Sequence, residues 1–102
     1  MTIAPHTPDT NRLAVEADLI TTVATALDLP DGRVTAGYFA ALGRAVVTVT
    51  GCRNIPHSED TSRAAADALS EAGYPLHFAN FGRRGPARGV GEYRAEIAVN
   101  VR

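Results

Sequence analysis

Apolar side chains recur at helical spacing over the first third of the chain and predict an amphipathic helix over about residues 9–28. The expected buried stripe consists of Leu13, Ala17, Ile20, Val23, Ala24 and Leu27. The Thr-Pro-Asp run at 7–9 is typical of a helix start, because it supplies a cap, a first-turn proline and an acidic residue. The Pro-Asp-Gly run at 30–32 ends the helix, since proline cannot continue it and Asp-Gly favours a turn.

The following segment alternates as strands do and predicts a hairpin over residues 33–52. The run at 45–50 is rich in β-branched residues and predicts one strand. Its partner is expected at 33–39. The alternating apolar positions there are Val34, Ala36 and Tyr38. Residues 40–43 allow two interpretations, a hairpin loop or the last turn of a short helix capped by Gly43, and the alternation favours the hairpin.

A second helix is predicted over 58–73. Ser58 is the expected cap, acidic residues follow it in the first turn, and Gly73 ends the helix. The acidic positions Glu59, Asp60, Asp67 and Glu71 are interpreted as a solvated face of this helix. Its small apolar residues suit close packing on a sheet.

Two further strands complete the pattern. One is predicted over 76–81, and the other over 92–101, with a Gly- and Arg-rich loop at 82–91 between them. In the last strand Tyr93, Ala95, Ile97, Val99 and Val101 share one face. Phe78 and Tyr93 are expected to pack in the core.

The predicted order is α-β-β-α-β-β, which indicates an α+β fold with a four-stranded sheet and both helices on one of its faces. The crossover through the second helix allows the central strands to run parallel. The order is also that of a ferredoxin-like unit whose first strand has moved to the end of the chain. Residues 1–7 are expected to form a loose tail, and residues 8–102 a single domain.

Composition narrows the class of protein. The chain has 102 residues and a net charge of −1, so it offers no global field that would attract nucleic acid. No apolar run approaches a membrane span, no signal peptide opens the chain, and one cysteine cannot form an internal disulfide. These features favour a cytoplasmic protein. All ten cations are arginine, as in GC-rich actinobacterial or phage genomes, and without lysine there is no Schiff-base or P-loop chemistry.

Positive charge gathers at the end of the chain. Residues 83–102 contain five arginines and two glutamates, a net charge of +3. Arg83, Arg84 and Arg88, with Arg94 beside them, could bind a polyanion such as DNA or RNA, because guanidinium groups bind phosphate in a bidentate fashion. The alternative interpretation is a charged hairpin tip that keeps the protein soluble.

Catalytic and metal chemistry have weaker support. Cys52, His57 and Asp60 are the residue types of a nucleophile, a base and an orienting acid, but they follow one another in a single loop. Cys52 is better interpreted as a small buried residue, and His57 as a neighbour of the helix cap. The histidines His6, His57 and His77 lack ligand spacing. No cofactor or metal is expected.

The sequence therefore predicts a small non-catalytic binding or regulatory module, of a size common among accessory proteins of phages and mobile elements. Its expected partner is another protein, or a second copy, docked on the exposed sheet face or on the edge strand 33–39. Nucleic-acid binding through the 82–91 loop is the alternative, and a small enzyme using Cys52 and His57 is the second alternative.

Overall fold

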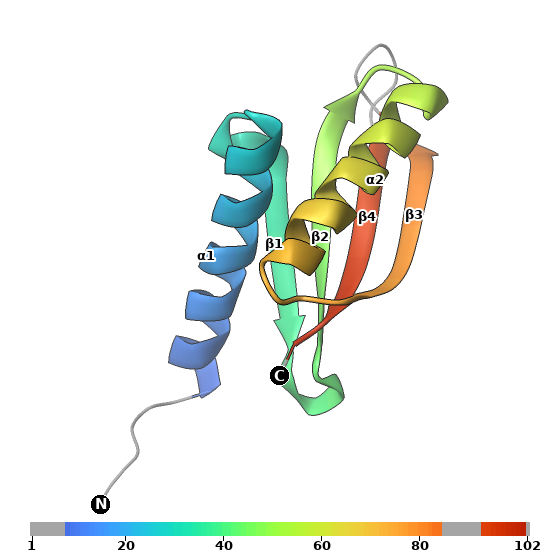
Figure 1. The fold of residues 1–102 in the computed structure, drawn as a ribbon. Coiled ribbons are helices and arrows are strands. Elements are labelled where there is room, and N and C mark those ends of the chain that lie inside the picture. The colour runs from blue at the N-terminus through green and yellow to red at the C-terminus, as the bar shows by residue number, and fades with distance from the viewer. Residues whose placement is uncertain (1–7, 85–92, 102) are drawn as a thin grey trace, which may run out of the picture.

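Two helices cover one face of a four-stranded antiparallel sheet, which confirms the α+β prediction (Figure 1). The computed structural model describes residues 8–84 and 93–101, without the side chains of residues 8–10, 31 and 81–84; the expected tail, residues 1–7, lies outside this range. In chain order the elements are α1 (Pro8–Leu27), η1 (Asp31–Arg33), β1 (Val34–Phe39), η2 (Ala40–Leu42), β2 (Arg44–Cys52), α2 (Ile55–Glu71), β3 (Leu76–Arg84) and β4 (Tyr93–Asn100). α1 packs beside β1, and α2 lies across the other three strands.

The strand order is β1-β2-β4-β3, and every neighbouring pair is antiparallel. The expectation of parallel central strands is therefore wrong: β4 enters between β2 and β3, which run in the same direction without being neighbours. Ala95, Ile97 and Val99 of β4 are fully buried, and such burial favours a place between two other strands. A β-α-β unit split by an inserted strand is a ferredoxin-like arrangement, so the permuted topology considered from the sequence fits the observed order.

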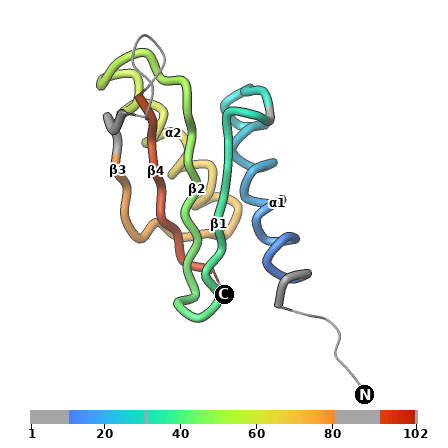
Figure 2. The backbone as a smooth tube through the Cα atoms, turned by 180° about the vertical axis from the view of Figure 1, so that it is seen from behind, coloured from blue at the N-terminus to red at the C-terminus, as the bar shows by residue number. Residues whose placement is uncertain are grey.

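The core lies between the helices and one face of the sheet. Its largest fully buried side chains are Leu19, Leu69, Ile97, Val23, Val47, Val49, Val99 and Cys52. Figure 2 shows the molecule from behind, where the sheet stands in front of α2, α1 lies beside β1, and no described element covers the other face of the sheet. In the part of the chain that is described, neither helix combines the length and the apolar character that crossing a bilayer requires.

The side that α1 presents to the sheet overlaps the predicted stripe without matching it: Val23 and Ala24 are buried, and Ile20 and Leu27 pack against the core. Leu13, the first residue of the expected stripe, is 58% exposed, whereas Leu19, which the stripe omitted, is fully buried beside Val23. The reason is that apolar residues occupy more than one side of α1, so its sequence permits more than one packing face. Contact with β1 selects the side that carries Leu19.

The connection between β1 and β2 combines the two interpretations of residues 40–43. The hairpin is confirmed, and its loop is the 3-10 turn η2. Gly43 adopts a left-handed conformation with φ of 63°, which glycine reaches without steric cost. Its N–H donates to the carbonyl of Ala40 at 3.1 Å.

The predicted cap of the second helix is wrong by one turn. Asn54, not Ser58, caps α2: its Oδ1 accepts the N–H of His57 at 2.8 Å. Pro56 in the first turn presets the backbone for the helix. Ser58 is consequently inside α2 and buried, where its hydroxyl donates to the carbonyl of Ile55 at 2.8 Å.

The third strand is longer than predicted. β3 continues through residues 82–84, which were expected to belong to the loop, because Arg83 pairs with Arg94 and Arg84 with Tyr93. The remainder of the predicted loop, residues 85–91, lies outside the described residues. The last strand agrees with prediction to within one residue at each end.

Gly51 permits a β-bulge near the end of β2, where the register with β4 shifts between Val49 and Cys52. Its φ is 80°, and a Cβ placed there would lie 2.8 Å from Nε of Arg33. That Nε donates to the carbonyl of Thr50 at 2.9 Å. The bulge therefore depends both on a left-handed residue and on the absence of a side chain.

We expect Gly51→Ala to lower the free energy of unfolding by about 1–2 kcal/mol, because alanine is strained at this φ and displaces the Arg33 side chain. Urea unfolding followed by circular dichroism measures the change. Gly32→Ala is the matched control, since no atom lies within 4 Å of its added Cβ. An equal loss in both variants would contradict the assignment.

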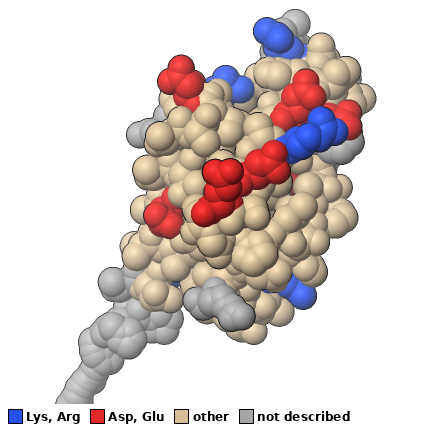
Figure 3. Space-filling model, viewed as in Figure 1, with Lys and Arg blue, Asp and Glu red and all other residues tan. Residues whose placement is uncertain are grey.

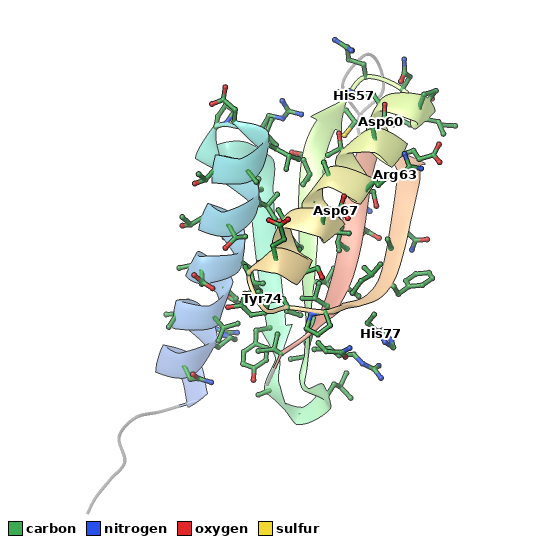
Figure 4. The ribbon with its side chains drawn as sticks, viewed as in Figure 1. His57, Asp60, Arg63, Asp67, Tyr74 and His77 are labelled. Atoms are coloured by element: carbon green, nitrogen blue, oxygen red, sulfur yellow. The ribbon has the colours of Figure 1, made fainter. Side chains whose placement is uncertain are left out.

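A hydrogen bond ties α1 to the turn after α2. Oη of Tyr74 donates to Oδ2 of Asp18, and Figure 4 shows Tyr74 between α1 and the sheet. This hydrogen bond, followed by burial and the negative charge of Asp18, raises the pKa of Tyr74 from 10.0 to about 12. The neutral phenol is thus favoured in the folded chain.

The direction of this pKa shift predicts that the folded chain loses stability at alkaline pH. A folded-state pKa above the unfolded value gives stability that is fully present below pH 10.0 and is lost as the pH rises toward about 12. Tyr74→Phe should cost about 1 kcal/mol near neutral pH and should remove this part of the alkaline loss. Urea unfolding from about pH 8 upward measures both effects. Parallel losses in wild type and variant over that range would refute the prediction.

Candidate protein-binding site

Of the catalytic candidates Cys52, His57 and Asp60, the cysteine is buried and the other two have separate partners. Cys52 is fully buried at the end of β2, so its sulfur is inaccessible to a substrate in the folded chain. Nδ1 of His57 accepts the N–H of Arg53 at 3.0 Å, and the exposed Asp60 pairs with Arg63 at 3.5 Å. Catalysis by these residues stays a hypothesis without geometric support. Within residues 8–84 and 93–101, no three His, Cys, Asp or Glu side chains gather as a metal site would require.

The four arginines proposed for polyanion binding are placed only in part. Arg88 lies outside the described residues, and Arg83 and Arg84 are described by their backbone alone. Nε of the half-buried Arg94 lies 3.5 Å from Oε2 of Glu96, so this guanidinium already has a carboxylate beside it. The polyanion interface stays a prediction.

An apolar row crosses the open face of the sheet. The register aligns Gly37 of β1, Val46 of β2, Ala98 of β4 and Phe78 of β3. The ring of Phe39 lies over Gly37, and Phe39 and Phe78 are 52% and 55% exposed. The expectation that Phe78 packs in the core is wrong, because a bulge after Leu76 turns Phe78 to the open face.

The β1 edge of the sheet is closed. The N–H of Tyr38 points away from β2 and donates to Oε2 of Glu16, on α1, at 2.9 Å. The backbone N–H and C=O of Val34 point away from β2 as those of Tyr38 do, and Val34 is 2% exposed. α1 runs along this edge (Figure 1). An incoming strand would have to displace α1. The edge strand expected to dock a partner is therefore at the edge, but it is covered.

No other described strand pairs with the outer edge of β3, and the hydrogen-bond pattern identifies which backbone groups this edge offers. Because Tyr38 points away from β2, its partner Ala45 must point its N–H and C=O toward β4, and the alternation continues across the sheet. The N–H of Asn100 accordingly donates to the carbonyl of Pro75 at 2.9 Å. Ala79 and Phe81 therefore direct their N–H and C=O groups away from β4.

Two bulges limit the length of this open edge. The register between β3 and β4 shifts between Leu76 and Phe78 and again between Phe81 and Arg83. Bulges bend a strand and interrupt its regular ladder. The straight part of the edge is consequently the run 78–81, which suits a short added segment rather than continued sheet growth.

A hollow of about 250 Å³ opens between α2 and β3, directly beside this edge. It is lined by Glu59, Ser62, Arg63, Ala66, Asp67, Leu76 and Ala79. Leu76 is 48% exposed. Two other hollows, of about 280 and 470 Å³, lie against the helices and do not adjoin an open strand edge. Of these three hollows, the one beside β3 allows a partner to be recognised both by its backbone and by a side chain.

Acidic side chains follow α2 (Figure 3), and two of them, Glu59 and Asp67, line this hollow. Arg63 is engaged within the helix, by Glu59 at 3.0 Å and Asp60 at 3.5 Å. Asp67 is exposed, and no ion pair joins it to another described residue. Figure 4 shows Asp67 beyond Arg63, nearer the end of α2. A free carboxylate thus remains at the rim.

Sequence reasoning missed this site for identifiable reasons. The acidic residues of α2 recur at helical spacing. The same spacing is typical of an ordinary solvated helix face, which is how the sequence analysis interprets them. β3 is an edge strand because β4 lies between β2 and β3. Local periodicity does not determine this order of strands. The sequence signal available for this site was the pair of large apolar residues at the start of the strand, Leu76 and Phe78.

No protein-family model matches the chain, and no curated protein matches it. The assignment of function therefore rests on the geometry of the described residues.

Proposed function

We propose that the chain is a small non-catalytic protein-binding module, and that an extended segment of a partner protein adds to the sheet along β3. The supporting observation is the difference between the two edges. α1 and Glu16 close β1, whereas the register leaves the backbone groups of Ala79 and Phe81 directed outward on β3. Strand addition of this kind uses main-chain hydrogen bonds for affinity and adjacent pockets for specificity.

The open face of the sheet is a weaker candidate for the docking surface. Four strands about 4.8 Å apart and seven residues of about 3.4 Å each give roughly 450 Å². A standard interface buries about 800 Å² on each partner. The row next to the apolar one is polar, with Thr35, Thr48, Glu96 and Asn80 in register. The β3 edge needs less area because backbone hydrogen bonds contribute, each by about 1 kcal/mol.

Peptides that bind the full chain can be selected from a random library. The proposal predicts that such peptides dock on β3 in an extended conformation. Selected peptides would be titrated into ¹⁵N-labelled protein, with amide shifts followed by NMR. The largest shifts are expected at Ala79 and its neighbours. Ala79→Pro should weaken binding at least about tenfold, since it removes an outward N–H and leaves the ladder with β4 intact.

Phe39→Ser is the matched control, because it removes an exposed apolar side chain from the opposite edge of the sheet. It should bind the selected peptides as wild type does. Thermal unfolding of both variants verifies that the fold is retained. Loss of binding in Phe39→Ser together with full binding in Ala79→Pro would move the site to the open sheet face and overturn the proposal.

A further inference from the structure

From the hollow beside β3 we infer the chemistry of the captured segment: a bulky apolar residue lies opposite Ala79, and a basic residue two positions later faces Asp67. The inference rests on the proposed function, since it concerns the side chains of a segment that first has to pair with β3. It follows from the register, the size of the hollow and the charge along its rim.

The register decides which side chain enters the hollow. Directly opposed residues of antiparallel strands project to the same face of the sheet. Ala79 pairs with the buried Ile97, on the face that carries the helices, and it lines the hollow. The residue that exchanges hydrogen bonds with Ala79 therefore projects its side chain toward α2.

The size and lining of the hollow select a bulky apolar side chain. A cavity of about 150 Å³ holds a benzene molecule, and this hollow measures about 250 Å³. The apolar residues of its lining are Ala66, Leu76 and Ala79. A leucine or phenylalanine fits this space and would cover Leu76, which is otherwise 48% exposed.

The rim selects a basic neighbour. The lining of the hollow carries the carboxylates of Glu59 and Asp67 against the guanidinium of Arg63, a net charge of −1. Arg63 is already paired with Glu59 and with Asp60, which leaves Asp67 as the free acidic group that lines the hollow. An arginine or lysine is the side chain that would neutralise it.

The position of the basic residue follows from the direction of the strands. α2 ends shortly before β3 begins, so Asp67 lies toward the Leu76 end of the hollow. All observed pairs in the sheet are antiparallel, which is also the more stable pairing per residue. In an antiparallel segment the next side chain on this face, toward Leu76, lies two residues after the apolar one.

Synthetic hexapeptides test the inference on the full chain by NMR titration. The reference peptide is acetyl-Thr-Thr-Leu-Thr-Arg-Thr-amide. Replacing its leucine by alanine should weaken binding about tenfold, because the apolar contact is lost. Replacing its arginine by glutamate should weaken binding about threefold or more at low salt, and less at high salt. N-methylation of the leucine should abolish binding, since that N–H donates to the carbonyl of Ala79.

The protein variant Asp67→Asn supplies the reciprocal test. It should remove the preference for arginine over glutamate and keep the preference for leucine over alanine. Glu71→Gln is the matched control, because Glu71 is an exposed carboxylate of the same helix that does not line this hollow. This control should retain both preferences.

The outcomes separate the two proposals. Shifts at Ala79 with equal affinity for all side chains would overturn the inferred chemistry and leave the docking mode standing. Absence of shifts on β3 with every hexapeptide, and with the peptides from random selection, would overturn both. A concentration-dependent dimer in sedimentation, returned to monomer by Ala79→Pro, would identify a second copy as the occupant and overturn the inference.

Discussion

The insertion of β4 between β2 and β3 is the constraint on which the rest of this structure depends. It places Ala95, Ile97 and Val99 at the centre of the sheet, where they are fully buried beneath the helices. It also makes β1 and β3 the two edges, and it fixes which backbone groups face outward on each. The two edges then differ because Glu16 of α1 occupies an outward N–H of β1, while a hollow between α2 and β3 adjoins the other edge.

The helices therefore have unequal roles. α1 protects an edge, and its Glu16 satisfies a backbone N–H that water or another strand would otherwise take. α2 supplies the core residues Ala65 and Leu69 on one side and the acidic rim on the other. Where a helix lies alongside an unpaired strand, one partner segment can form main-chain hydrogen bonds with the strand and place side chains against the helix.

Local periodicity was sufficient to predict most elements from the sequence, because β-branched alternation in β2 and β4 and helical spacing in α1 are local signals. It failed at two positions. Ser58 has the chemistry of a cap, but Asn54 and Pro56, a competing local signal, start α2 one turn earlier. Phe78 has the chemistry of a core residue, but a bulge turns it outward. Strand order, and with it the candidate site, depends on contacts between distant segments.

The burial of Cys52 makes the lone thiol a reporter of opening at the end of β2. It is the last residue of this strand, it pairs with Tyr93 of β4 beyond the residues of β2 that pair with β1, and it has no exposed surface. Its sulfur can be reached only when this end of β2 opens, either locally or with the whole fold. Alkylation of this sulfur would then proceed only through opened molecules, and the larger side chain would hinder their closing. An alkylated Cys52 would thus mark each molecule in which this end of the sheet had opened.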